Sequence, residues 1–260
     1  MTGALVEELA LALALADIAD AITLPPFERR SFTVDHKADG SEVTELDVAA
    51  ERAIVARLAT ERPGHAVLGE ELGVGGGGAT WQWIIDPIDG TSGYARGIPV
   101  WATLIALADG DDVPVVAVVS APALHRRWWA ARGAGAFVDG RPCRVSDIGE
   151  LADAQVSVTF SPGWDDLGLT PALVGLASGA RRARGFGDFW QHVLVAEGGL
   201  DVAVDAVGVA PHDIAAVRLV VEEAGGTLTD RYGVATHRAG TAISTNGLLH
   251  AEVLRRLAAP

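Results

Sequence analysis

The sequence predicts an α/β protein made of two halves that form one compact unit. Three observations support this prediction. The 260 residues are enough to bury a large core. Short apolar runs alternate with segments of helical spacing along the whole chain, and the pattern changes near residues 147–153. We therefore expect an N-terminal α+β half over 1–148 and a C-terminal α/β half over 149–260.

Two helices are predicted early in the first half. Leu, Ala and Ile recur at helical spacing over 4–22, and Pro25 and Pro26 are expected to end that helix. Thr44 is the expected N-cap of a second helix, from Glu45 to about Glu61.

The apolar runs that follow predict a sheet. Each run is short and bounded by Gly, Asp or Pro, as strands usually are. The expected strands are 66–68, 81–85, 100–108, 113–120, 127–131 and 136–138. A four-glycine tract, Gly75–Gly78, separates the first two strands.

Strands and helices interleave throughout the second half. Strands are expected at 156–160, 201–204 and 242–244. Helices are expected at 171–177, 188–197 and 212–224, and a last one runs from Asn246-Gly247 to about Leu257.

Composition and charge exclude several classes of protein. Apolar residues make up 49% of the chain and charged residues 21%, which is typical of soluble enzymes rather than disordered chains. The net charge of −14 disfavours nucleic acid and membrane surfaces as partners. The apolar run 9–16 lacks a basic lead-in, so it predicts a helix rather than a signal peptide. A single cysteine, Cys143, is expected to be a packed thiol, and we expect a cytoplasmic protein.

A compact acidic motif, DPIDGT, spans residues 86–91. We expect Asp86 to end an apolar strand because Pro87 stops the pairing, while Gly90 lets the backbone approach a ligand. The amides of Gly90 and Thr91 could face an anion if a helix begins there. Carboxylates this close together hold protons unless a cation neutralises them. The motif therefore favours a Mg²⁺ site over a solvated acidic turn.

Other acids lie where predicted strands end or helices begin. Glu70 and Glu71 follow the strand 66–68. Asp47 and Asp213 lie in the first turns of their helices, where a carboxylate also stabilises the helix dipole by roughly a few tenths of a kcal/mol. Taken singly, Asp47 and Asp213 each have this stabilising role as an open alternative to a functional one.

Taken together, these motifs resemble the inositol-monophosphatase family in order and spacing over nearly the whole chain. The residues that carry the resemblance are Lys37, Asp39, Gly40, Ser41, Val43, Thr44, Asp47, Gly69-Glu70-Glu71, Trp83 to Thr91, His212-Asp213, Ala215-Ala216 and Glu223 to Gly226. The resemblance implies a layered αβαβα sandwich, usually dimeric, and a Mg²⁺-dependent phosphomonoesterase with two or three ions per site.

The resemblance also implies roles for individual residues. Metal ligands would be Glu70, Asp86, the carbonyl of Ile88, Asp89 and Asp213. Asp47 and Thr91 would orient and help deprotonate the attacking water, with Glu70 assisting. Two cations roughly 3.5–4 Å apart suit in-line displacement at phosphorus without a covalent phosphoenzyme.

Within the family, several stretches resemble the actinobacterial histidinol-phosphate phosphatase branch, among them 97–107, 119–124 and 126–133. Histidinol phosphate carries an ammonium and an imidazole, so its binder should present acids. Asp188 is the first candidate, with a helix N-cap as its alternative role, and Asp205 is the second. The expected substrate-binding residues are Gly90, Thr91, Ser92, Gly187, Asp188, Asp205 and His212.

Three positions depart from the pattern of that branch. Residues 92–94 (SGY) stand where a Lys or Arg and an aromatic residue are usual, which removes a cation near the phosphate. His212 replaces a Trp, and it could cap its helix, touch substrate or, by default, pack as a polar core residue. An acid is missing at Ala206, while Asp205 lies one residue further out.

These departures leave alternatives for the function. The leading expectation is hydrolysis of L-histidinol phosphate in histidine biosynthesis. The alternatives are another small ester, such as inositol monophosphate, a nucleoside monophosphate or a secondary-metabolite phosphate, and a metal-binding module without turnover. Retention of every expected ligand argues against the last.

Overall fold

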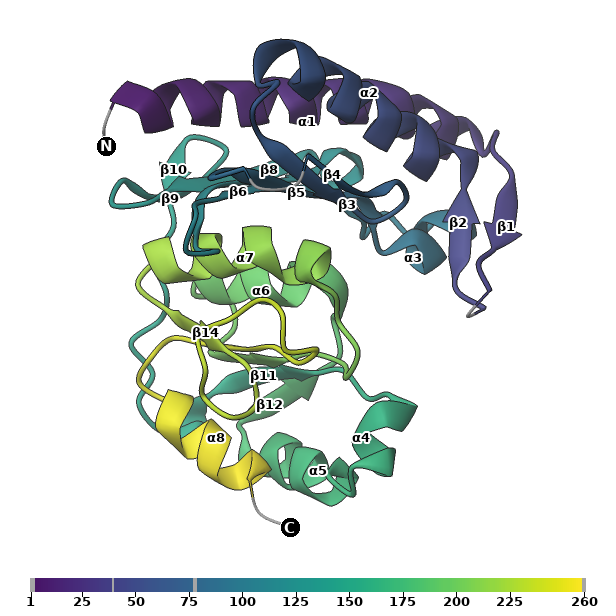
Figure 1. The fold of residues 1–260 in the computed structure, drawn as a ribbon. Coiled ribbons are helices and arrows are strands. Elements are labelled where there is room, and N and C mark those ends of the chain that lie inside the picture. Colours follow the sequence, from purple (N-terminus) through teal and green to yellow (C-terminus); the bar gives the residue numbers. More distant parts are fainter. Residues whose placement is uncertain (1–2, 39, 77–78, 259–260) are drawn as a thin grey trace.

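The computed structural model describes residues 3–38, 40–76 and 79–258, which form five stacked layers (Figure 1). Helices α1 (Gly3–Arg29) and α2 (Glu45–Glu61) cover one face of a large sheet. Helices α6 (Asp188–Ala196) and α7 (Pro211–Glu223) lie between that sheet and a smaller one. Helices α5 (Thr170–Gly179) and α8 (His250–Leu257) form the last layer, on the outer face of the smaller sheet, and α4 (Pro162–Asp166) lies beside them. The αβαβα sandwich expected from the resemblance is thereby confirmed.

The large sheet belongs to the first half of the chain. Strands β3 and β5 pair in parallel, and the other neighbours pair antiparallel. In spatial order its described strands are β10 (Arg141–Pro142), β9 (Gly135–Val138), β8 (Arg126–Ala131), β7 (Pro114–Ala121), β6 (Ala102–Ala108), β5 (Gln82–Asp89), β3 (Ala66–Gly69) and β4 (Gly73–Gly75).

The smaller sheet belongs to the second half. Its described strands, in spatial order, are β12 (Arg182–Arg184), β11 (Gln155–Val158), β13 (Val202–Val204), β15 (Ile243–Thr245) and β14 (Thr227–Thr229). The first half also contains the short helix α3 (Thr91–Arg96) and a hairpin of β1 (Val34–His36) and β2 (Glu42–Thr44).

Buried apolar side chains fill the spaces between the layers. One core lies between α1, α2 and the large sheet, and it includes Leu15, Ile54 and Trp83. A second core joins the large sheet to α6 and α7, so it draws residues from both halves of the chain, among them Leu104 and Val217. The helices α6 and α7 therefore fix the second half against the sheet that ends in the acidic motif.

Helix α2 begins where its cap residue predicted. The Thr44 hydroxyl accepts a hydrogen bond from the Leu46 amide at 3.2 Å, and the Asp47 carboxylate accepts one from the Thr44 amide at 2.8 Å. These bonds satisfy donors that a helix end leaves free. The prediction of a helix over 45–61 is confirmed.

The prediction that the two prolines end the first helix is wrong. Pro25 and Pro26 lie inside α1, which continues to Arg29. A proline inside a helix costs about 3 kcal/mol through its missing hydrogen bond and steric clash. Burial of Phe27 against Trp101, with ring centroids 5.3 Å apart, offsets this cost by holding the last turn in an aromatic cluster.

The end of β5 also differs from the prediction. Asp86 pairs with Leu104, but the strand does not stop there, because Asp89 pairs with Ala102 and a register shift lies between the two pairs. Pro87 interrupts pairing only locally, since a bulge takes up the extra residue. Asp86 and Asp89 therefore both lie in the C-terminal part of β5.

Most other predicted elements differ from the observed ones by a residue or two at their ends. The sequence analysis missed short elements with little periodicity, namely β1, β2, β4, β10, β12, β14, α3 and α4. In the glycine tract, Gly75 belongs to β4, whereas residues 77–78 lie outside the described residues, as does residue 39. Cys143 is buried as expected. Among the described helices, none is both long enough and apolar enough to cross a bilayer.

Candidate metal and phosphate site

Strand pairing brings Glu70 next to the acidic motif. The parallel pairing of β3 with β5 sets Gly69 opposite Ile85, and the Glu70 amide donates to the Ile85 carbonyl at 3.2 Å. Glu70 therefore follows β3 at a point beside Asp86 of β5. The Asp86 carboxylate is fixed by a hydrogen bond from the Ile88 amide at 3.0 Å.

Helix α7 brings the remaining acid from the second half of the chain. Asp213 lies in its first turn and accepts a hydrogen bond from the Ala210 amide at 2.6 Å. One oxygen each of Asp86, Asp89 and Asp213 lies within 4.8 Å of the other two. Four carboxylates expected as ligands are thus brought together, because Glu70 adjoins Asp86 in a second such group.

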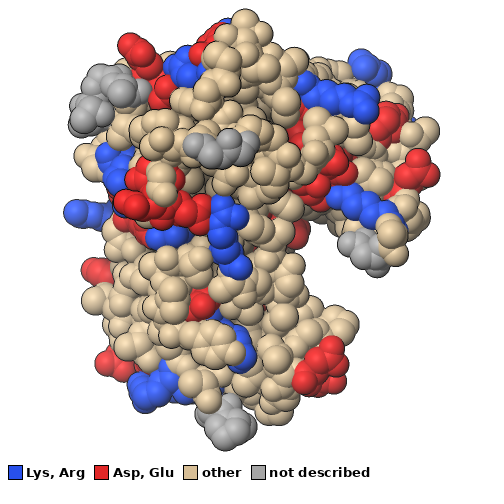
Figure 2. Space-filling model, in the orientation of Figure 1, with Lys and Arg blue, Asp and Glu red and all other residues tan. Residues whose placement is uncertain are grey.

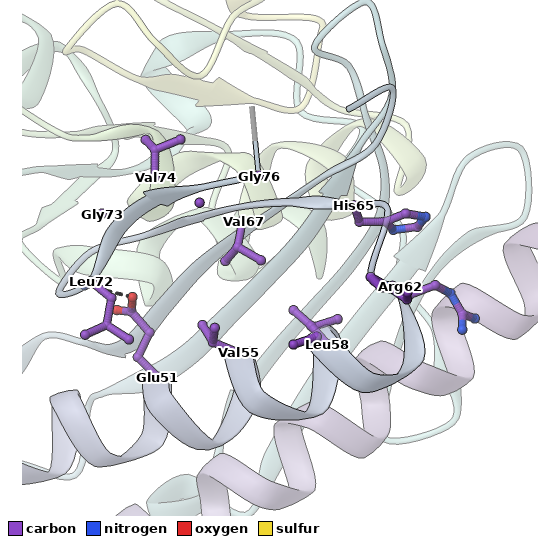
Figure 3. A pocket seen from close by; sticks show the side chains of 13 residues that line it. Glu51, Val55, Leu58, Arg62, His65, Val67, Leu72, Gly73, Val74 and Gly76 are labelled. Carbon is purple, nitrogen blue, oxygen red and sulfur yellow. Dashed lines mark hydrogen bonds between the residues drawn. The ribbon is translucent and has the colours of Figure 1, made fainter. Parts of the chain in front are cut away.

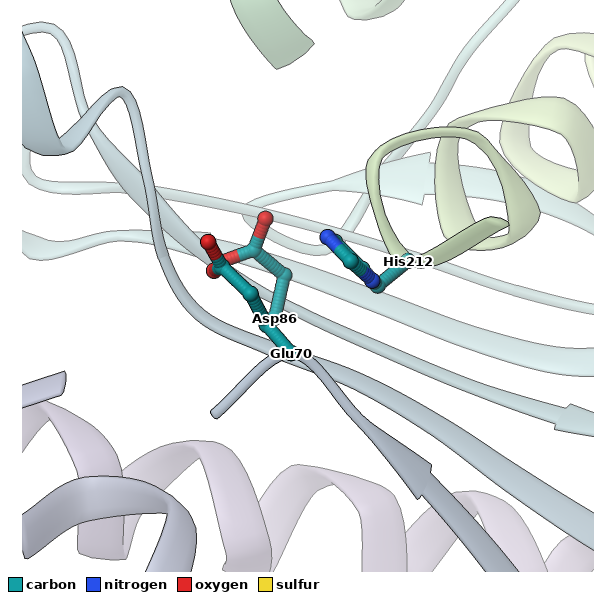
Figure 4. A group of neighbouring side chains, drawn as sticks. All are labelled: Glu70, Asp86 and His212. Carbon is teal, nitrogen blue, oxygen red and sulfur yellow. The ribbon is translucent and has the colours of Figure 1, made fainter. Parts of the chain in front are cut away.

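His212 completes that second group, together with Glu70 and Asp86 (Figure 4). The expectation that it packs in the core is wrong, because its ring is half-buried and points toward the two acids. The ring also lies 3.5 Å from the Asp213 carboxylate. The start of α7, with Pro211 at its first position, aims the ring into the cluster instead of the core.

Burial and mutual repulsion raise the pKa values of these acids. Burial is the main cause of the raised pKa of Asp86, followed by the charges of Glu70, Asp89 and Asp213. Burial also raises the pKa of Asp89. Asp86 is 2% exposed and Asp89 8%. A divalent cation would relieve this repulsion, and a set of oxygen donors fits a hard cation such as Mg²⁺.

Asp47 and Thr91 form a hydrogen-bonded pair beside the cluster. The Thr91 hydroxyl lies 2.8 Å from the Ile88 carbonyl oxygen and 3.2 Å from Asp47 Oδ1. The Asp47 carboxylate also accepts from the Thr44 hydroxyl at 2.6 Å. Burial raises the pKa of Asp47 to about 6. A carboxylate with a pKa nearer neutrality is a stronger base than an exposed one.

Asp47→Asn is expected to gain stability over the wild type as pH rises. Because the folded-state pKa of Asp47, about 6, lies above its ordinary value of 3.8, the folded protein binds more protons between these pH values. Wild-type stability therefore falls across this window, by up to about 3 kcal/mol for a two-unit shift, and the variant escapes this loss. Urea unfolding in EDTA at pH 4.5 and pH 7 measures the difference. A pH-independent difference would contradict the assignment.

A cavity of about 530 Å³ opens beside the cluster. It lies below the β1–β2 hairpin and α3, where the molecule is hollowed between its two halves (Figure 2). Its lining residues are His36, Gly40, Ser41, Glu42, Glu70, Gly90, Thr91, Ser92, Arg96 and Asp188. Five of the residues predicted from the sequence are among them.

Gly90 and Asp188 lie next to each other in the lining of this cavity. Gly90 has φ 87°, and a Cβ there would lie 3.1 Å from the Val100 carbonyl oxygen and 3.4 Å from Asp188 Oδ2. Glycine is thus required for conformation and for space. Helix α3 begins at Thr91, so the amides there can face an anion, as the motif suggested.

The N-cap alternative for Asp188 is wrong. The N-cap of α6 is Gly187, and Asp188 is the first helical residue, with no side-chain capping bond. Its φ of 48° is uncommon for a residue with a side chain and is typical of functional positions. Partial burial and the charges of Asp205 and Asp213 raise its pKa to about 6. Asp188 is exposed to the cavity, so water screens its repulsion from neighbouring acids and this repulsion has little effect on the stability of the fold.

Asp205 lies near Asp188 but behind the cavity wall. It is 5% exposed. His192, which is fully buried, lies 3.0 Å from one Asp205 oxygen, and the Ala206 amide donates to the other at 2.7 Å. Both oxygens therefore have partners within the protein, so Asp205 acts on the cavity through its charge.

One cation that lines the cavity, Arg96, was missed by the sequence analysis. Arg96 donates to the Ser92 carbonyl at 2.8 Å and to Glu42 at 2.8 Å. It supplies a positive charge at the rim where residue 92 has none. The i, i+4 spacing from Ser92 to Arg96 on a helix was the available signal. Lys37, the only lysine in the chain, pairs with Glu70 at 2.7 Å.

The chain is similar to known proteins in both sequence and fold. A model of the inositol monophosphatase family matches residues 5–259. The histidinol-phosphatase of Mycobacterium tuberculosis is 51% identical, over 96% of this chain and 98% of that protein. The histidinol-phosphatase of Streptomyces coelicolor is 43% identical, over 95% and 96%. Among solved structures, the extragenic suppressor protein SuhB of Bartonella henselae superposes with a TM-score of 0.88 at 28% identity, covering 97% of this chain and 98% of that one.

Proposed function

Because this chain belongs to the inositol monophosphatase family, we propose that it is a Mg²⁺-dependent phosphomonoesterase that hydrolyses L-histidinol phosphate to L-histidinol and phosphate. The observation that carries the chemistry is the convergence of Glu70, Asp86, Asp89 and Asp213 at one end of a 530 Å³ cavity. The names of the two similar bacterial proteins support the choice of ester.

The residues that would hold Mg²⁺ are these four carboxylates and the carbonyl of Ile88. Two or three ions per site are proposed, as the family resemblance implied. When bound, Mg²⁺ supplies positive charge for the phosphoryl oxygens and lowers the pKa of coordinated water. The raised pKa values of Asp86 and Asp89 support this role, because buried carboxylates without a cation tend to hold protons.

The residues of the chain position and activate the attacking water. The Thr91 hydroxyl can accept a hydrogen bond from that water while it donates to Asp47 Oδ1, 3.2 Å away. The proton of the water then passes to Asp47 as the water oxygen bonds to phosphorus and the ester P–O bond breaks. The leaving alkoxide takes up a proton from a solvent water. Glu70 would assist as a ligand of the metal.

The carboxylates at the cavity rim could bind a leaving group that carries positive charge. The carboxylates of Asp188 and Glu42 line the cavity together with Arg96. Asp188 can receive the ammonium or imidazolium of histidinol phosphate, and the charge of Asp205 behind it strengthens that preference. Gly187 sets the turn that presents Asp188, and Ser92 and His212 complete the proposed contacts.

A substrate panel tests this proposal. Mg²⁺-dependent phosphate release is measured with histidinol phosphate, inositol 1-phosphate, nucleoside monophosphates and an aryl phosphate. We expect histidinol phosphate to lead by about two orders of magnitude or more in kcat/KM, since hydrogen bonds to charged groups of the substrate discriminate strongly. If inositol 1-phosphate or another ester leads, the choice of substrate is wrong and the metal chemistry stands. No Mg²⁺-dependent release with any ester would contradict the function itself.

Asp188→Asn is expected to separate substrate recognition from chemistry. Asn tolerates the left-handed backbone conformation at this position, so the variant removes charge without adding strain. KM for histidinol phosphate should rise about tenfold or more, because a hydrogen bond between charged groups contributes roughly 1.5–3 kcal/mol. Steady-state kinetics with an aryl phosphate, which lacks the cationic group, should stay within about threefold of the wild type. Equal losses on both substrates would exclude Asp188 as a specificity residue.

We also propose that the enzyme is a homodimer that works in the cytoplasm on a small phosphate ester. The net charge of −14 supports the absence of nucleic acid and membrane surfaces among its partners. Sedimentation analysis of the purified protein tests the dimer, and a monomer at micromolar concentration would contradict it.

A further inference from the structure

A buried glutamate on α2 contacts the turn that carries Glu70. Glu51 is 0% exposed, and its two carboxylate oxygens accept hydrogen bonds from the amides of Glu71, at 2.8 Å, and Leu72, at 2.9 Å. Figure 3 shows its side chain reaching from α2 toward Leu72. Both amides belong to the turn 70–72 between β3 and β4.

The neighbouring backbone is shaped to receive this carboxylate. A Cβ at Gly69 would lie 1.8 Å from Glu51 Oε1, so only glycine leaves the space that the carboxylate occupies. On the far side of Glu70, its own amide donates to the Ile85 carbonyl at 3.2 Å. The turn is thus anchored on one side by β5 and on the other by Glu51.

Side-chain packing contributes little to holding this turn. An apolar cavity of about 300 Å³ lies between α2 and the β3–β4 hairpin, lined in part by Val55, Leu58 and Leu72 (Figure 3). Leu72 is 45% exposed and Val74 is 70% exposed. With so little apolar burial, the position of the turn depends on its polar contacts, which are the hydrogen bonds above and the ion pairs of Lys37 with Glu70, at 2.7 Å, and with Glu71, at 2.6 Å.

We propose that Glu51 is a positioning residue that fixes the turn 70–72 and thereby aims the Glu70 carboxylate at Asp86. Glu51 does not touch the acid cluster itself and acts through the backbone on either side of Glu70. The inference rests on the proposed function in one respect, namely that Glu70 binds Mg²⁺. Substitution of a residue that orients a metal ligand typically weakens metal affinity about 10–100-fold.

Glu51→Ala tests this role through two measurements. In the metal-free protein, the amides of Glu71 and Leu72 should exchange with solvent at least about tenfold faster by NMR, because their acceptor is lost. The Mg²⁺ concentration for half-maximal aryl phosphate hydrolysis should rise about tenfold, with kcat at saturating Mg²⁺ within about threefold. Arg52→Ala, on the exposed face of the same helix, should change neither quantity.

Gly69→Ala provides a second and independent test. The added methyl group displaces the Glu51 carboxylate, so this variant should reproduce both effects. In a Glu51→Ala background the space is free, and Gly69→Ala should then add little, which gives a clear non-additive cycle. Effects that simply add would overturn the proposal, as would a Mg²⁺ requirement unchanged in either single variant. A wild-type protein that binds no Mg²⁺ in calorimetry would instead refute the proposed function, while the amide-exchange result would still test the anchor.

Discussion

Asp86→Asn is expected to abolish hydrolysis while leaving the metal-free protein as stable as the wild type, or more stable. Asp86 belongs to both groups of side chains that could hold a metal ion among the described residues. Loss of one ligand charge removes several kcal/mol of electrostatic stabilisation, which corresponds to at least about a thousandfold in kcat/KM. The folded protein, in contrast, loses a source of repulsion with Glu70, Asp89 and Asp213.

Three measurements check this expectation. Phosphate release is compared at saturating Mg²⁺, Mg²⁺ binding is measured by calorimetry, and thermal unfolding is followed in EDTA. Asp153→Asn, an exposed acid away from the cluster, serves as the matched control and should behave as the wild type in all three. A metal-free melting temperature many degrees below the wild type would show that Asp86 stabilises the fold and would contradict the metal-site assignment.

Thr91→Val is expected to lower kcat by about 10²–10⁴, the range for loss of general acid–base catalysis. Valine keeps the shape of threonine but lacks the hydroxyl that lies between Asp47 and the Ile88 carbonyl. Because the Thr91 side chain is not among the expected metal ligands, the Mg²⁺ concentration for half-maximal rate should change little. KM should also change little, since the loss concerns the transition state.

Thr91→Ser distinguishes a chemical role from a structural one. Serine restores the hydroxyl on a smaller side chain, so it should recover most of kcat. Single-turnover kinetics on both variants separate the chemical step from product release. If Thr91→Val keeps kcat within threefold of the wild type, or if Ser and Val are equally impaired, the water-activating role of the pair with Asp47 is wrong.

Elements that are specified by residues within their own segment were predicted well from the sequence. Thr44 marked the start of α2 because a capping residue acts on amides within one turn of itself. The motif 86–91 was recognised because two acids, a proline and a glycine in six residues have few other uses. Helix α6 was placed within one residue for the same reason, since its periodicity is contained in its own segment.

Features that depend on contacts between distant residues were predicted poorly. Pro25 and Pro26 argued for a helix end, but Phe27 packs on an aromatic cluster that the first helix meets only in the folded chain. Asp188 was weighed as a cap, and only the folded chain shows that Gly187 is the cap and that Asp188 lines the cavity. Arg96 was overlooked because its value lies in its contact with Glu42, a residue distant in sequence that lines the same cavity.

The sequence by itself determined the type of chemistry, because the acids and their flanking residues are covalently ordered and their local rules leave little choice. Only the tertiary structure decided that Glu70 and Asp213 each come close to Asp86, in two groups of side chains that could hold a metal ion, because α7 docks on the large sheet through a buried core shared by both halves. The anchoring of the turn 70–72 by Glu51 is likewise a feature that only the tertiary structure decided. Burial and long-range packing are properties of the whole chain, and no short segment records them.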